Sequence, residues 1–226
     1  MTKDWRLKGR GALVTGSGGV TGRAIAEALA AEGVKVCSVN GREGAEAIVK
    51  QAVDTLGHVD ILINAASEVR RPDPIPADID AASWNEAMES EFEQPRRLAH
   101  DLIPDMIEAG WGRIVNIIGP SEPPLFSVEY AASGALQGWA KSLDRATGAS
   151  GITINCIQPG IIEGTAAAAD YDEAELTGME DPVIPFGEIG DAADIAHAVV
   201  FLCSPLSRYI SGIVLPVDGG LGRHQH

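Results

Sequence analysis

Short apolar runs alternate with longer amphipathic segments along the whole chain. The runs are rich in β-branched residues and almost continuous, as expected of strands buried on both faces; they lie at 11–15, 34–39, 59–64, 113–118, 153–157 and 213–217. Segments with apolar residues at helical spacing separate these runs, at 23–32, 44–56, 83–109, 130–147 and 192–202. Strands that alternate with long helices are typical of an α/β fold with a doubly wound parallel sheet.

Two segments depart from this regular alternation of strands and helices. The segment 83–109 contains Pro95 and Pro104, so we expect its helix to be interrupted near both prolines. The stretch 164–185 is irregular, acidic and proline-containing, and it follows a strand at the edge where such sheets bind ligands. This stretch is the candidate lid over the ligand site. We expect the whole chain, residues 1–226, to form a single domain.

Composition and charge narrow the possible partners. The formal net charge of −15 disfavours nucleic acid and anionic membranes, so a small-molecule ligand is the expected partner.

Cys37, Cys156 and Cys203 form no CxxC pair and are expected to be buried reduced thiols. No apolar run is long enough for a membrane span, so we expect a cytoplasmic protein. No spacing of His, Cys and carboxylate residues indicates a metal site.

Ordered landmarks make the chain resemble the short-chain dehydrogenase/reductase family over essentially its whole length. They are Thr15-Gly16…Gly22, Asn64-Ala65-Ala66, the strand Gly112–Ile117, Tyr130 in a helix, Asn155…Pro159-Gly160, Ile195-Ala196…Ser204 and Ile210-Ser211-Gly212…Asp218-Gly219-Gly220. The resemblance implies a Rossmann-type sheet and a site for NAD or NADP. It also implies a homodimer or homotetramer formed through the two longest helices.

One departure from the family concerns the sheet. Only the sixteen residues Arg42 to Gly57 separate the second strand from the next apolar run, where the family has helix, strand and helix. We therefore expect the family's third strand to be missing, with strand order 2-1-4-5-6-7 in family numbering. The acidic residue that contacts adenine in the family is lost with it, although Asn40 and Arg42 could meet a ribose or its 2′-phosphate.

The cofactor loop departs from the family as well. The family motif T-G-x-x-x-G-x-G places glycines where backbone N–H groups approach a pyrophosphate. Here Val20 stands at the middle required glycine, and its branched side chain would occupy space that the pyrophosphate normally takes. The candidate dinucleotide-binding residues, if a dinucleotide binds, are Gly16, Gly19, Gly22, Asn40 and Asn64.

The family's catalytic residues are largely replaced. Tyr130 remains, but Gly134 stands where the family has its lysine, and without that cation the phenol is expected to be a poor base at neutral pH. Gly119 stands at the serine position, with Ser121 as a possible substitute two residues later. Glu91 stands at the asparagine position, where a buried carboxylate could act as a general base; it could equally be a surface acid.

These replacements favour a cofactor-independent acid–base enzyme, an isomerase, dehydratase, cyclase or lyase acting on a small apolar molecule through Tyr130 and Glu91, with Ser121 as a further candidate. On this hypothesis no cofactor is needed, although NAD or NADP remains possible. One alternative is a divergent NAD(P)-dependent oxidoreductase that uses Tyr130 with Ser121 or Ser133 in changed roles. The other is a catalytically inactive subunit that pairs through its long helices.

Overall fold

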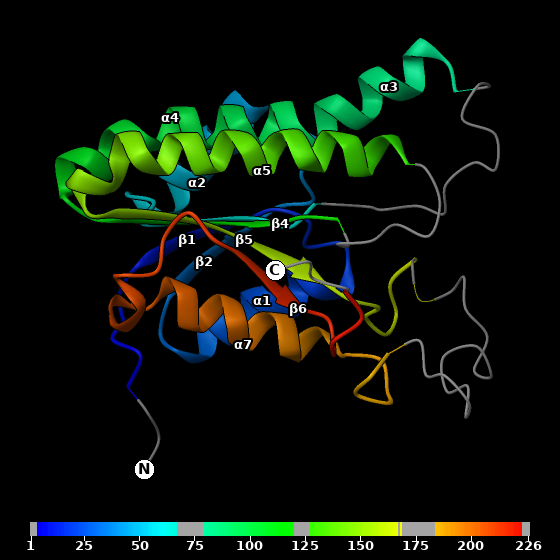
Figure 1. Cartoon of the computed structure of the whole chain (residues 1–226). Coiled ribbons are helices and arrows are strands. Elements are labelled where there is room, and N and C mark those ends of the chain that lie inside the picture. Colours follow the sequence, from blue (N-terminus) through cyan, green and yellow to red (C-terminus); the bar gives the residue numbers. More distant parts are fainter. Residues whose placement is uncertain (1–3, 67–78, 120–126, 167, 169–183, 223–226) are drawn as a thin grey trace.

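A parallel sheet forms the centre of the molecule in this computed structural model, which describes residues 4–66, 79–119, 127–166, 168 and 184–222 (Figure 1). Within these residues the sheet has six strands: β1 Gly11–Val14, β2 Lys35–Ser38, β3 Ile61–Asn64, β4 Gly112–Ile117, β5 Ile152–Pro159 and β6 Val214–Val217. Their order is β2-β1-β3-β4-β5-β6, and every neighbouring pair is parallel. All residues of β1, β3 and β4 are buried, which explains their unbroken apolar character.

This strand order confirms the predicted sheet that lacks the family's third strand. A single helix, α2 Ala45–Leu56, fills the connection between β2 and β3, so no residues remain for a further strand. As a result β2 is an edge strand and pairs with β1. The carboxyl ends of the interior strands, where ligands bind in such sheets, are unaffected by the deletion.

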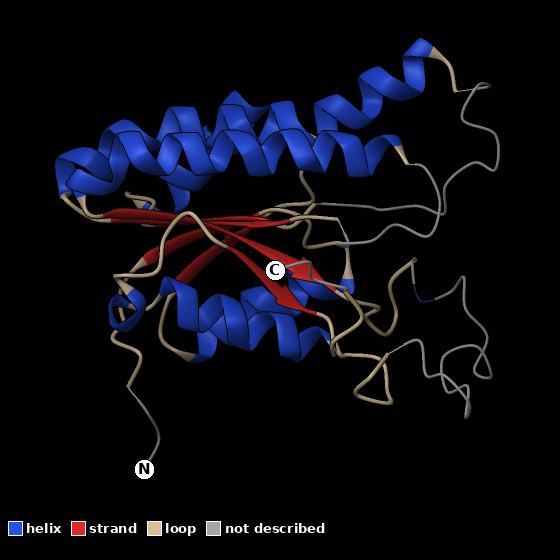
Figure 2. Cartoon of the chain, in the orientation of Figure 1, coloured by secondary structure: helices blue, strands red, loops and turns tan. Residues whose placement is uncertain are grey.

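Two helical layers cover the sheet, as Figures 1 and 2 show. Helices α1 Val20–Ala31 and α7 Ala192–Cys203 pack on one face, where they bury Ile25, Leu29, Ile195 and Val199. The other face carries α2, α4 Gln94–Ala109 and α5 Val128–Thr147, whose buried residues include Ile48, Leu98, Leu102, Met106 and Leu136. Each helix thus presents one apolar stripe to the sheet, as its sequence period predicts.

The segment expected as one interrupted helix has its irregularity directly before Pro95, at one of the two predicted places. It consists of α3 Ala81–Met88, a π-helical turn Glu89–Glu93 and then α4. Pro95 follows the π-turn by two residues, and this agrees with the interruption predicted there. Pro104 lies inside α4 without ending it. The predicted break at Pro104 is therefore wrong. The π-turn, of a kind frequently found at functional sites, contains the buried Glu91.

Three further expectations from the sequence concern membrane spans, the candidate lid and the cysteines. Within the described residues, no helix combines the length and the apolar character that crossing a bilayer requires. The candidate lid 164–185 lies mostly outside the described residues, so it stays a prediction. The three cysteines are buried free thiols, as predicted.

Candidate functional site

A glycine-rich turn connects β1 to α1 at the carboxyl edge of the sheet. Gly16 has a φ of +74°, and a Cβ at this position would lie 2.2 Å from the carbonyl oxygen of Ala65. A Cβ on Gly22 would lie 2.3 Å from the carbonyl oxygen of Gly16. The first turn of α1 therefore packs directly against the turn that precedes it, and a larger residue at position 16 or 22 would separate them.

The N-terminus of α1 has the properties of an anion site. Gly19 is its N-cap residue, without a capping side chain, and the first turn contains no acidic residue. Backbone N–H groups and the helix dipole at such an end favour a phosphate. Val20 is the first helical residue, and its Cγ1 lies 3.3 Å from where a Cβ on Gly164 would be. The absence of a side chain at Gly164 thus leaves room for the valine that replaces the family's glycine.

The end of β2 also touches this turn. The backbone N–H of Ser17 donates to the carbonyl oxygen of Val39 at 3.1 Å, and the Ser17 hydroxyl lies 3.5 Å from Asn40 Oδ1. Asn40 and Arg42 line a cavity of about 610 Å³. Its other charged residues are all glutamates: Glu43, Glu86, Glu89, Glu91 and Glu129.

Asn64 ends β3 and is buried beneath the α4–α5 layer. Its Nδ2 donates to Asn116 Oδ1 at 2.8 Å, and Asn116 Nδ2 lies 3.9 Å from the sulfur of Cys156. Burial raises the pKa of the Cys156 thiol to about 11, although the contact with Asn116 opposes the shift. Asn64 Oδ1 has no hydrogen-bond partner among the described residues. Asn64 lines a small cavity to which Thr15, Glu91 and Leu136 also contribute.

Tyr130 lies in the first turn of α5, close to the end of β4. Ser127 caps the helix, because its hydroxyl oxygen accepts a hydrogen bond from the N–H of Tyr130 at 3.2 Å. The Tyr130 side chain is partly exposed, at 36%. It lines a cavity of about 140 Å³ between α5, the end of β4 and the end of β5, together with Ile118, Gly119, Ala131, Ser133, Gly134, Gln137 and Gln158.

Two side chains in this cavity hold the backbone of Gly119. The hydroxyl oxygen of Ser133 accepts a hydrogen bond from Gly119 N at 2.8 Å. Gln158 Nε2 donates to the carbonyl oxygen of Gly119 at 3.2 Å. A hydroxyl that accepts one hydrogen bond still carries a proton that it can donate. Ser133 is buried, at 3% exposure, which fixes its position one turn after Tyr130.

The structure describes one of the two positions at which we expected the family's lysine and serine to be replaced or substituted, Gly134, but not the other, Ser121. A Cβ on Gly134, the position expected from the sequence to correspond to the family's lysine, would meet no described atom within 4 Å. Ser121 lies outside the described residues, and its suggested role stays a prediction.

The structure brings together some of the candidate residues. Asn40 and Glu91 line one cavity, and Asn64 and Glu91 line another. Glu91 lines the cavities beside Asn40 and Asn64, and Tyr130 lines the cavity at the end of β4. Glu91 is 5% exposed, so the surface reading of this residue does not apply.

Sequence reasoning missed Gln158, although a signal was present. This residue stands at the carboxyl end of β5, directly before Pro159-Gly160, and side chains at that edge of a parallel sheet face the ligand site. A metal site has no support from the part of the chain that is described, where no group of three His, Cys or acidic residues could hold an ion.

These features define the protein's class: a doubly wound sheet with a dinucleotide-type glycine turn at its first strand and a tyrosine cavity at the same edge. The sequence profile described as enoyl-(acyl carrier protein) reductase matches residues 14–222. The chain thus belongs to the short-chain dehydrogenase/reductase family.

Similar curated proteins cover nearly the whole chain. The 3-oxoacyl-[acyl-carrier-protein] reductase FabG of Vibrio cholerae is 32% identical over 243 residues, which span 95% of this chain and 98% of the relative. The enzyme of the same name from Escherichia coli K12 is 34% identical over 245 residues, with coverages of 95% and 98%.

Solved structures agree with this assignment. The crystal structure of the TT0495 protein from Thermus thermophilus aligns with a TM-score of 0.85 and 28% identity, covering 94% of this chain and 98% of that one. A blue fluorescent protein from a metagenomic library, solved in complex with NADPH, aligns with a TM-score of 0.81 and 26% identity, covering 96% and 99%.

The comparisons correct the main functional expectation from the sequence. A cofactor-independent acid–base enzyme is wrong as the leading hypothesis, because the similar curated proteins are named reductases and a similar structure is a complex with NADPH. The replaced residues around Tyr130 had pointed away from redox chemistry. The relatives instead favour the alternative, an oxidoreductase that uses NAD or NADP.

Proposed function

We propose that this protein is an NAD(P)-dependent oxidoreductase that reduces a carbonyl group, or oxidises the corresponding alcohol, at Tyr130. The observation that carries the proposal is the close-packed glycine turn at Gly16 and Gly22 in front of the uncapped N-terminus of α1. The similar reductases, aligned over 95% of the chain, support it.

The residues present fit a dinucleotide. Positions 16 and 22 have no space for a side chain, so the turn closes tightly and α1 packs against it, as the first and last glycines of a dinucleotide turn require. Val20 stands at the middle position, where the backbone would meet the diphosphate. Asn40 and Arg42 follow β2, next to the glycine turn. Arg42 is the cationic residue that lines this cavity, and it could pair with a ribose 2′-phosphate; we therefore propose NADPH as the preferred form.

When bound, NADPH supplies a hydride to the substrate carbon. The chain's own residues then have to bind the carbonyl oxygen and provide a proton. Tyr130 is the proton donor in this proposal, because the family resemblance assigns the tyrosine role to it and it is partly exposed to the cavity. Ser133 donates its hydroxyl proton to the same oxygen, in the role that the family's serine fills from the position of Gly119.

An assay of NADPH consumption with a short 3-oxoacyl thioester tests this proposal, since the relatives' names identify that class of substrate. We expect turnover by the wild type. Tyr130→Phe should lower kcat by about 100-fold or more without changing NADPH affinity. Ser133→Ala should also lower kcat, whereas Ser142→Ala, which removes an exposed hydroxyl on the same helix, should not.

Loss of turnover in Ser142→Ala equal to that in Ser133→Ala would contradict the assigned role of Ser133. Full activity in Tyr130→Phe would contradict the proposed proton donor.

A further inference from the structure

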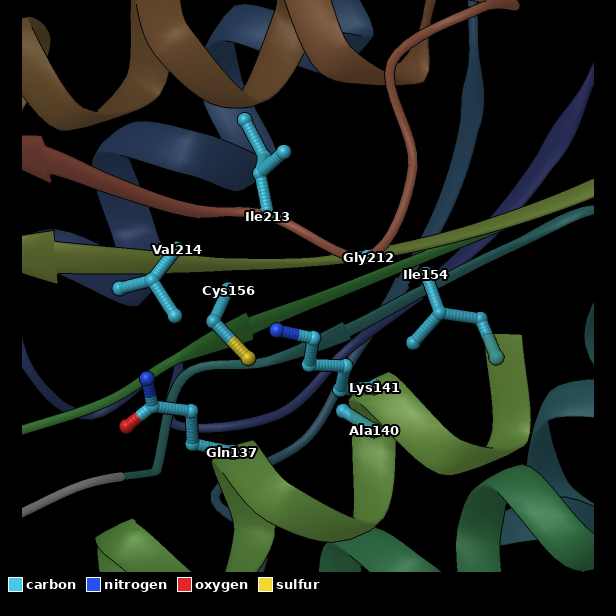
Figure 3. Close-up of a pocket in the computed structure, with 8 residues that line it drawn as sticks. All are labelled: Gln137, Ala140, Lys141, Ile154, Cys156, Gly212, Ile213 and Val214. Atoms are coloured by element: carbon cyan, nitrogen blue, oxygen red, sulfur yellow. The ribbon is translucent and has the colours of Figure 1, made fainter. Parts of the chain in front are cut away.

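A second cavity, of about 390 Å³, lies between the later turns of α5 and the strands β5 and β6 (Figure 3). Its lining consists of Gln137, Ala140, Lys141, Ile154, Cys156, Gly212, Ile213 and Val214. It shares only Gln137 with the Tyr130 cavity. The volume lies in the range of small-molecule sites, at its lower end.

The floor of this cavity is apolar. Ile154 and Val214 come from neighbouring strands, and Ile213 precedes β6. Cys156 adds a neutral thiol, because burial raises its pKa to about 11 and keeps it protonated at physiological pH. These side chains suit an aliphatic group and carry no negative charge themselves. The carboxylate of Asp144 lies next to the lining residue Gly212, since its Oδ2 is 2.9 Å from where a Cβ on Gly212 would be.

Lys141 is the one charged residue in this lining. Figure 3 shows its amine reaching over the cavity towards Cys156, with the amide of Gln137 also lining the space. Among the described residues, no carboxylate lies within ion-pair distance of Lys141. Asp144, one turn further along α5, is hydrogen-bonded by Ser211 instead.

Some cations of the described chain have a carboxylate partner, as Lys50 has in Asp54, and others, such as Lys8 and Lys35, have none. The feature of Lys141 that matters here is its place in the lining of an apolar cavity. An ammonium that has no carboxylate partner in the described part of the chain, beside an apolar cavity, is complementary to a ligand with one negative charge and an apolar body. A single cation is a poor match for a dianion such as a phosphate monoester.

We propose that this cavity binds a small amphipathic carboxylate, with its carboxylate on Lys141 and Gln137 and its alkyl chain on Ile154, Ile213 and Val214. The site is separate from the dinucleotide turn, and its occupation requires neither the cofactor nor turnover.

Calorimetric titration of the wild-type protein with octanoate tests the proposal. Octanol and octylammonium serve as probes with the same chain and a neutral or positive head. We expect octanoate to bind with a Kd of about 1 mM or tighter, and each of the other two probes to bind at least about tenfold more weakly.

Two variants locate the binding site. Lys141→Met keeps most of the side chain's apolar length and removes its charge, so octanoate affinity should fall about tenfold or more; Lys141→Arg should retain binding. Lys50→Met is the matched control, since it removes one positive charge from an exposed helical position elsewhere and should leave the affinity unchanged. Circular dichroism checks that all three variants are folded.

Several outcomes would overturn the proposal. These are no octanoate binding by the wild type at millimolar concentration, equal affinity in Lys141→Met, or an equal loss in Lys50→Met. A molar mass from light scattering that falls in Lys141→Met, with no octanoate binding, would identify the cavity as an interface between copies of the chain instead.

Discussion

The substitution Gly22→Ala tests how the glycine turn is built. In an open helix position, alanine stabilises a protein by up to about 1 kcal/mol relative to glycine. At position 22, however, the new Cβ would lie 2.3 Å from the oxygen of Gly16 and 2.6 Å from its carbonyl carbon. Relieving this contact requires α1 to move away from the turn by roughly 1 Å, since ordinary contacts begin near 3.4 Å.

We expect the cost of this overpacking, about 1–3 kcal/mol, to exceed the gain in helix propensity. Gly134→Ala is the control, because a Cβ there meets no described atom within 4 Å, so it should stabilise the protein by about 0.5–1 kcal/mol. Urea unfolding followed by circular dichroism measures both changes. If Gly22→Ala proves as stable as Gly134→Ala, the close packing of α1 on the turn is refuted.

Three other substitutions test individual contacts. Val20→Gly should tighten NADPH binding, because it removes a branched side chain from the phosphate-facing end of α1; a titration that shows equal or weaker binding would mean that Val20 is no obstacle. Arg42→Ser should weaken NADPH binding about tenfold or more and leave NADH binding unchanged, whereas an equal effect on both nucleotides would exclude contact with the 2′-phosphate. The third substitution concerns Cys156, because burial raises the pKa of its thiol from 9.0 to about 11. Above pH 9 the thiol ionises in the unfolded chain but stays protonated in the folded one. The free energy of unfolding should therefore fall by up to about 3 kcal/mol as the pH rises to 11. Cys156→Ala should remove that part of the slope in urea titrations, and identical slopes would disprove the assignment.

The sheet could be predicted from the sequence because its central strands are buried on both faces. Runs such as Ile61–Asn64 are apolar at every position but the last, and the single helix between β2 and β3 left no room for a third family strand. An interruption near Pro95 could be predicted from the proline, but its form, the π-turn at Glu89–Glu93, could not, since its residues resemble those of an ordinary acidic helix. Pro104 misled the prediction because α4 tolerates it without ending.

The site was harder to predict, because cavities form between elements that are distant in sequence. Tyr130 was identified by its position in a motif, and the turn glycines by their spacing. The hydrogen bonds of Ser133 and Gln158 to Gly119 depend on how α5 and β5 meet the end of β4, which no spacing reveals. The absence of the family's lysine at position 134 led to the wrong leading hypothesis, because a missing residue shows only that one mechanism has changed.

Calorimetric titration with NADPH and NADH tests the central claim most directly. We expect saturable binding of NADPH with a Kd of about 10 μM or tighter, close to −7 kcal/mol, and a clear loss of affinity in Gly22→Ala. Absence of binding by either nucleotide up to about 1 mM, in protein shown by circular dichroism to be folded, would contradict the assignment of an NAD(P)-dependent oxidoreductase.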